Sequence, residues 1–277
     1  MQEYSNHTQN SITFTGEGVH YGKNVTMQVI PQVSGGIVFK RTDISGDNEI
    51  RAHYTNVVPA KLNTTITNGF TSVATVEHLM AGLFGMQIKH AMILIDGSEV
   101  PLMDGGSSDF IFGLECLTIA KQETTVFELK DEVKVSLGDA YIIAKPCHTL
   151  KISSTVDFPH PCIGKQTYLY DKTKNNFKEE IAYAKTFGHI TQIEEMQKNG
   201  LCLGGDMYSA IIFNDEKILS PEFAYNNNDF VQHKLLDFIG DIYLAGCDIH
   251  AEFECYKTSH HLNNVLLSKI FDCTDNS

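Results

Sequence analysis

Two short segments far apart in the sequence constrain the fold most, because each carries residue types that bind metal. One is residues 75–80 (TVEHLM) and the other is residues 233–237 (HKLLD). A histidine beside a carboxylate, together with a second histidine and an aspartate one helical turn later, can supply three metal ligands and one base. Any fold that uses both segments in one hydrolytic zinc site must bring the two halves of the chain together there.

Helical geometry divides the roles within these segments. His233 and Asp237 are four residues apart, so a helix presents both side chains on one face, where they can grip one ion. Glu77 and His78 are adjacent and point about 100° apart on a helix. We therefore expect His78 to bind the metal and Glu77 to reach the attacking water as general base. Gly82 lies four residues after His78, so the H-E-x-x-H motif of zincin proteases is absent.

Each of these residues also has an ordinary structural explanation. His233 and Asp237 could form a surface ion pair, His78 could be packed in the core, and Glu77 could be a solvated helix carboxylate. A zinc hydrolase needs three protein ligands and an open position for water, and His78, His233 and Asp237 meet that count. Taken singly, each residue leaves both interpretations open.

A general acid is also needed to protonate the leaving amine. Residues 259–261 (SHH) lie between an expected strand and an expected helix, and we choose His260, although one of two adjacent histidines can be a plain surface residue. Asp241 lies two turns after His233 on the same helical face and could hold a histidine in its cationic form. A solvated aspartate is the alternative.

Charge and composition exclude several classes of function. The formal net charge of −13 argues against generic binding to nucleic acid or to anionic membranes. The seven cysteines are an odd, scattered set without a C-x-x-C pair, which favours a reducing cytoplasm over a disulfide framework. Residues 1–12 are polar, so neither a signal peptide nor an anchor is expected there. No stretch approaches the roughly 20 apolar residues that span a bilayer, so no transmembrane segment is expected.

The pattern of apolar residues predicts an α+β fold in two parts. Expected strands in the first half are residues 25–31, 36–41 and 91–96, with helices at 76–84 and 108–116. The polar residues 121–125 suggest a boundary, giving domains 1–120 and 126–277. In the second half we expect strands at 132–135, 141–144, 150–156 and 249–256 and helices at 229–244 and 261–271, with no regular helix at 158–161.

These residues stand within a longer set of matching blocks, and together the blocks resemble one family closely. The sequence is similar to the bacterial zinc-dependent UDP-3-O-acyl-N-acetylglucosamine deacetylases, which carry out the committed step of lipid A synthesis. The matching blocks are residues 16–20, 75–80, 99–105, 185–188, 200–205, 230–237, 240–241 and 256–264.

The resemblance implies a role for each candidate residue. His78, His233 and Asp237 would bind one zinc ion per chain, Glu77 would be the base, and His260 would be the acid with help from Asp241. Thr186 would lie near the substrate carbonyl, Lys234 near polar substrate groups and Phe187 beside the sugar nucleotide; these three roles rest on the resemblance.

The family also implies a fold. We expect two similar two-layer α/β sandwich domains with the active site at their interface. An insert in the second domain would form a tunnel for the substrate's acyl chain, with residues 158–170 as part of it.

The function expected is removal of the N-acetyl group of UDP-3-O-(3-hydroxyacyl)-N-acetylglucosamine by a cytoplasmic monomer. Its partner would be this UDP-sugar lipid, and any contact with the inner membrane would be peripheral. Two alternatives stay open: a zinc amidase for another acylated amino sugar, and a non-catalytic sugar-nucleotide binding protein. The presence of both an acid and a base disfavours the binding protein, which needs neither.

Overall fold

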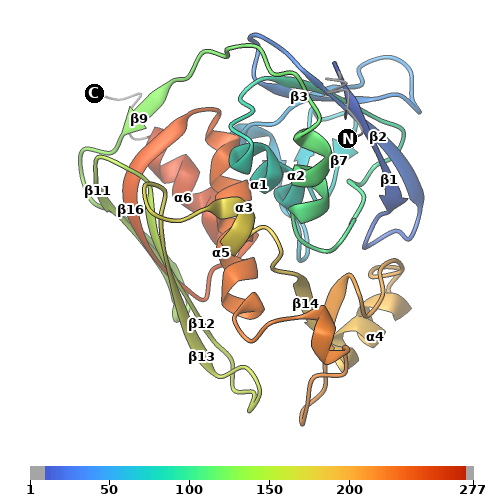
Figure 1. Cartoon of the computed structure of the whole chain (residues 1–277), viewed down its shortest axis with the longest axis vertical. Helices are drawn as coiled ribbons and strands as arrows, with labels where there is room; N and C mark the ends of the chain where they lie inside the picture. Colours follow the sequence, from blue (N-terminus) through green and yellow to red (C-terminus); the bar gives the residue numbers. More distant parts are fainter. Residues whose placement is uncertain (1–9, 273–277) are drawn as a thin grey trace, which may run out of the picture.

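An open sheet forms the framework of the first half of the chain. The computed structural model describes residues 10–272, and this sheet has the order β1-β2-β8-β3-β4 (Figure 1). Its strands are β1 (Ile12–Glu17), β2 (Asn24–Pro31), β3 (Ile37–Arg41), β4 (Glu49–Arg51) and β8 (Ala91–Ile95). Along β2, Val25, Met27 and Val29 are buried while the residues between them are more exposed, which is the alternation of a strand with one face on the core.

Two helices and a small meander complete the first half. They are α1 (Glu77–Gly85), α2 (Ser108–Leu114), β5 (Val57–Val58), β6 (Thr65–Thr67) and β7 (Ser72–Val73), with a short 3-10 turn at Tyr54–Asn56. Phe110 of α2 packs edge-on against Phe14 of β1, with ring centroids 5.2 Å apart. The helices therefore share the apolar core with the sheet.

A second sheet organises the other half. The strand path is β10-β11-β16-β12-β13, and β9 adds to β16. The strands are β9 (Val126–Glu128), β10 (Val133–Leu137), β11 (Ala140–Pro146), β12 (Lys151–Asp157), β13 (Lys165–Asp171) and β16 (Asp248–Tyr256). The helices of this half are α5 (Asp229–Ile242), which a 3-10 turn at Tyr243–Ala245 extends, and α6 (His260–Asp272). Phe238 of α5 packs on Phe253 of β16 at 5.2 Å between ring centroids.

A smaller unit stands beside this second sheet. The parallel pair β14 (Thr186–His189) and β15 (Ala210–Phe213) is connected through α4 (Ile190–Lys198), and α3 (Phe177–Glu180) precedes it. A 3-10 turn at Glu222–Ala224 leads from it towards α5. In Figure 1 this unit lies below the first sheet.

Helices α1 and α5 meet at the centre of the molecule, and one glycine lets them come close (Figure 1). A Cβ on Gly240 would lie 2.1 Å from the carbonyl oxygen of Glu77, far inside van der Waals contact. The two segments that the sequence analysis paired are therefore neighbours across this helix crossing.

Most elements match the expected ones. The helices expected at 76–84, 108–116, 229–244 and 261–271 are present as α1, α2, α5 and α6, and residues 158–161 form no helix. The expectation for residues 1–9 lies outside the described residues. No helix within residues 10–272 is long and apolar enough to cross a membrane. One continuous apolar core contains residues of both halves, and the division at residues 120–126 stays a prediction.

Candidate active site

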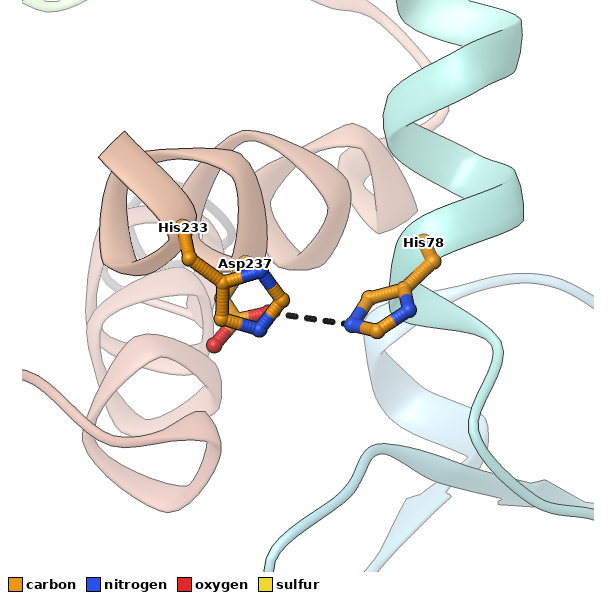
Figure 2. Close-up of side chains that lie close together, drawn as sticks. All are labelled: His78, His233 and Asp237. Atoms are coloured by element: carbon orange, nitrogen blue, oxygen red, sulfur yellow. Dashed lines mark ion pairs between the residues drawn. The ribbon is translucent and has the colours of Figure 1, made fainter. Parts of the chain in front are cut away.

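Three side chains from the two central helices converge. Nε2 of His78 lies 3.5 Å from Oδ1 of Asp237, and Nε2 of His233 lies 3.4 Å from the same oxygen. One potential ligand atom from each residue lies within 4.8 Å of the other two, and all three residues are buried. Figure 2 shows His78 projecting from α1 towards His233 and Asp237, which share one face of α5.

The environment of this trio fits a metal ion. Oδ1 of Asp237 is buried and has no hydrogen-bond partner among the described residues, although burying such an oxygen is unfavourable. Nitrogen and oxygen ligands about 2.0–2.1 Å from one tetrahedral ion would be roughly 3.3–3.4 Å apart, close to the observed separations. Nδ1 of His233 donates to the carbonyl of Ala184 at 3.1 Å, which leaves the Nε2 lone pair free to bind.

Burial keeps His233 neutral, as a ligand must be. Desolvation lowers the pKa of His233 to about 3, outweighing the opposing effect of Asp237. Desolvation alone would raise the pKa of Asp237, but the neighbouring His233 and Lys234 hold it well below its usual range. His233 therefore presents a neutral imidazole and Asp237 a carboxylate.

Lys234 binds Asp237 and lines the neighbouring cavity. Its Nζ donates to Oδ2 of Asp237 at 2.7 Å and lies 5.6 Å from the ring centroid of Phe187. Desolvation lowers the pKa of Lys234, but Asp237 and other carboxylates outweigh it, so that the pKa is raised. The ammonium group is thus a fixed positive charge beside the trio.

Glu77 lies next to the trio without joining it. The backbone N–H of Thr64 donates to its Oε2 at 3.0 Å, and its Oε1 lies 3.7 Å from Nε2 of His260. Glu77 is 2% exposed, and desolvation raises the pKa of its carboxyl above the ordinary value, although His260 and His78 oppose this. A carboxylate with a raised pKa accepts a proton more readily, which is the property of a general base.

His260, at the start of α6, faces Glu77 from the other side. Its Nδ1 donates to Oδ2 of Asp241 at 2.8 Å. Desolvation lowers the pKa of His260, but the charges of Asp241 and Glu77 outweigh it and raise the pKa to about 9. The imidazole is therefore a cation at neutral pH and can donate a proton.

Two residues that the sequence analysis did not single out hold Asp241 in place. The hydroxyl of Thr64 donates to its Oδ1 at 2.5 Å, and the side-chain amide of Asn263 donates to its Oδ2 at 2.7 Å. Thr64 also contacts Glu77 through its backbone, so it links the base to the residue behind the acid. Asn263 lies in residues 256–264, one of the blocks that are similar to the family. Nothing in the sequence around Thr64 indicated its role.

The converging residues open onto a cavity of about 300 Å³. Of the nine predicted site residues, eight line it, and Asp241 lies behind His260: the lining members are Glu77, His78, Thr186, Phe187, His233, Lys234, Asp237 and His260. Much of the apolar part of the wall comes from the β14–α4–β15 unit: Ile190, Ile193, Met196, Met207 and Ile212. The cavity wall thus combines charged and apolar side chains.

The expected position of the apolar wall needs correction. Residues 158–170 do not line the cavity. Phe158 instead packs on Phe187 from outside, with ring centroids 5.6 Å apart, and β13 pairs with β12 in the large sheet. Within this range residues 165–170 belong to β13 and pair with β12, and residues of α4 contribute to the lining instead.

The sequence is similar to one family of known proteins over nearly its whole length. Residues 6–272 match the profile of a family described as UDP-3-O-acyl N-acetylglycosamine deacetylase. The chain is 38% identical over 267 residues to the UDP-3-O-acyl-N-acetylglucosamine deacetylase of a Nitratiruptor species, covering 95% of this chain and 89% of the relative.

Two other relatives show similar sequence identity and coverage. The protein of the same description from Acidithiobacillus ferrooxidans is 39% identical over 264 residues, covering 94% of this chain and 87% of the relative. That of Pseudomonas entomophila is 37% identical over 272 residues, covering 96% and 90%. The similarity therefore extends over nearly the full length of both partners in each comparison.

Proposed function

The chain belongs to the family of the UDP-3-O-acyl-N-acetylglucosamine deacetylases, and we propose that it works through the residues around His78, His233 and Asp237. It hydrolyses the N-acetyl group of UDP-3-O-(3-hydroxyacyl)-N-acetylglucosamine, which releases acetate and leaves the free amine. This is the committed step of lipid A biosynthesis. The observation that carries the residue assignment is the buried Oδ1 of Asp237, which lies near two imidazole nitrogens and has no hydrogen-bond partner within residues 10–272.

His78, His233 and Asp237 would hold one zinc ion per chain. Bound there, zinc supplies a Lewis acid that activates water and polarises the amide carbonyl. Lys234 supports this assignment, because its bond to Oδ2 of Asp237 leaves Oδ1 directed at the histidines.

Glu77 acts as the general base. Oε2 is occupied by the Thr64 amide, so Oε1 is the oxygen that can take a proton from the attacking water. The raised pKa of Glu77 brings its basicity closer to neutral pH, where general-base catalysis is most effective. As the new C–O bond forms, the water proton passes to Oε1 of Glu77 and the π electrons of the C=O bond move onto the carbonyl oxygen.

His260 acts as the general acid. Its raised pKa keeps Nε2 protonated, and Nε2 is the nitrogen that faces Glu77 across the cavity. It gives its proton to the leaving nitrogen as the C–N bond breaks, so the neutral amine separates from acetic acid, which then ionises to acetate. Asp241 orients the imidazole through Nδ1 and stabilises its cationic form.

The remaining predicted residues stabilise charge and bind substrate. The Thr186 hydroxyl donates a hydrogen bond to the oxygen that becomes negative during attack. Lys234 binds polar substrate groups, and Phe187 packs beside the sugar nucleotide. The apolar wall of the β14–α4–β15 unit accepts the acyl chain, worth about 0.8 kcal/mol per buried CH₂.

We infer two similar two-layer sandwich domains, 1–120 and 126–277, with this site at their interface. The protein would work as a cytoplasmic monomer whose contact with the inner membrane is peripheral. The six cysteines within the described residues are all free, which suits a reducing compartment.

Acetate release tests the proposal. Purified protein is assayed with UDP-3-O-(3-hydroxymyristoyl)-N-acetylglucosamine, and with UDP-N-acetylglucosamine, which lacks the acyl chain. The acylated substrate should react much faster. Equal rates with both would contradict the acyl-binding role of the apolar wall, and release from neither would point to another acylated amino sugar or to binding alone.

A further inference from the structure

A second cluster of metal-binding side chains lies in the cavity wall, away from the His78, His233 and Asp237 trio. Sγ of Cys202 lies 3.8 Å from Nδ1 of His20 and 3.8 Å from Sδ of Met196. The cluster lines the same cavity. His20 and Cys202 have no role in the hydrolysis described above, and Met196 contributes only to the apolar wall.

The three side chains are fixed beside one another. His20 and Met196 are 4% and 7% exposed, and Cys202 is half-buried. The backbone on either side of Cys202 is tied to both partners: Leu201 N–H donates to the carbonyl of Met196 at 2.9 Å, and Leu203 N–H donates to the carbonyl of His20 at 3.1 Å. In Figure 1 this connection lies where the loop after α4 faces the β1–β2 turn.

The backbone of Cys202 itself is unusual. Its φ is +53°, a left-handed conformation that residues with a Cβ rarely adopt. Such a conformation persists only where the surroundings determine it, and it is common at functional sites. The next residue but one, Gly204, approaches the β1–β2 turn so closely that a Cβ there would lie 2.3 Å from the carbonyl oxygen of Gly18. The segment is therefore held against the turn by its backbone.

Hydrogen bonds account for both contacts in the metal-free protein. The thiol donates to the thioether of Met196, and the thiol sulfur accepts from His20 in the tautomer that carries the proton on Nδ1. Two sulfur ligands about 2.3 Å from one tetrahedral ion are roughly 3.8 Å apart, and a sulfur and a nitrogen ligand are roughly 3.5 Å apart. The separation of Cys202 and Met196 matches the first value, and that of Cys202 and His20 is longer than the second by about 0.3 Å. Thiolate and thioether ligands select soft ions such as Cu(I).

We propose that Cys202, His20 and Met196 form a second metal site, for a soft monovalent cation such as Cu(I), in the wall of the substrate cavity. Binding exchanges the thiol proton for the cation, so the thiolate and Cu(I) together are neutral, which suits a partly buried position. Burial raises the pKa of the Cys202 thiol, so only a strongly thiophilic ion displaces its proton. An ion there would occupy the wall that substrate contacts and would inhibit turnover.

A competition experiment tests the site. The zinc-loaded, full-length protein is titrated anaerobically with Cu(I) in the presence of bathocuproine disulfonate, a Cu(I) chelator that reports the transferred ion by its colour. The variants are Cys202→Ser, which removes the thiolate, and Met196→Leu, which keeps the shape of the wall but removes the thioether. Cys116→Ser is the matched control, because Cys116 is a free, exposed thiol whose sulfur donates to the Phe112 carbonyl.

The site predicts one tightly held Cu(I) in the wild type and in the control. Cys202→Ser should weaken binding by more than about 100-fold and Met196→Leu by about 10-fold. X-ray absorption at the copper edge should find two sulfur neighbours and one nitrogen neighbour in the wild type, and one sulfur in Met196→Leu.

Three results would overturn the proposal: unchanged binding in Cys202→Ser, a single sulfur neighbour in the wild type, or release of one zinc for each copper bound. The last result would mean that copper enters the His78, His233 and Asp237 site instead. These readouts need no turnover, so they stand apart from the proposed deacetylase activity.

Discussion

Replacement of Glu77 by glutamine isolates the proposed base. The side chain keeps its shape, and its amide oxygen can still accept from the Thr64 N–H. The amide nitrogen then takes the position of Oε1, which faces Nε2 of His260 at 3.7 Å. An amide nitrogen has no basic lone pair, so the variant loses the proton acceptor while the neighbouring groups stay in place.

The expected loss of activity in Glu77→Gln follows from the role of Oε1 as the proton acceptor. A positioned general base contributes about 10²–10⁴-fold to a rate, or roughly 3–5 kcal/mol of barrier. The loss should fall on kcat, because Glu77 lies beside the metal-binding trio and substrate contacts are unchanged. Folding should not suffer, since burial disfavours the charged form of Glu77 and the raised pKa reflects this.

The assay measures acetate release, zinc content and thermal unfolding on the same samples. Glu115→Gln is the control, because Glu115 is a surface carboxylate that pairs with Lys178 at 2.8 Å. It should keep wild-type turnover. Turnover of Glu77→Gln within tenfold of wild type, with zinc retained, would refute the assignment of the base.

Three further predictions concern the surroundings of the site. Asp241→Asn keeps a hydrogen-bond acceptor for His260 but removes the charge, so kcat should fall by about 10–100-fold with zinc content unchanged; an unaltered kcat would contradict the role of this carboxylate. Gly240→Ala places a methyl group 2.1 Å from the Glu77 carbonyl oxygen and should lower the free energy of unfolding in urea by about 1–3 kcal/mol or more, whereas a neutral change would mean that the helices separate freely. Burial raises the pKa of Tyr170 to about 12, so its contribution to stability is complete below the unfolded value of about 10 and is lost as the pH rises through the folded value. Tyr170→Phe should therefore reduce the change in unfolding free energy between about pH 9 and about pH 11 by about 1 kcal/mol, and equal pH dependence in both proteins would contradict this.

Local sequence signals predicted the elements that carry the site. The spacing of His233 and Asp237 requires only that residues 229–242 be helical, and the apolar periodicity of α5 secures that. In the same way, the local pattern of residues 76–84 predicted the helix α1, which carries His78. The residue types of the two segments suggested that these helices share one site, and the family resemblance gave the same partnership.

Contacts between distant residues were harder to predict. Thr64 touches both Glu77 and Asp241, yet its sequence neighbours give no sign of this, because the contacts depend on how the loop before β6 packs against α1 and α5. The apolar wall of the cavity was expected around residues 158–170, but β13 is an edge strand of the large sheet and α4 took that place. Both features depend on tertiary packing rather than on local propensity.

The most direct test of the central claim is the position of the metal. Crystals of the zinc-loaded protein are measured just above and just below the zinc absorption edge, and the two anomalous difference maps are compared. We expect one peak that vanishes below the edge, within bonding distance of Nε2 of His78, Nε2 of His233 and Oδ1 of Asp237. A folded, zinc-loaded protein whose peak lies elsewhere, or that has none at this position, would contradict the account.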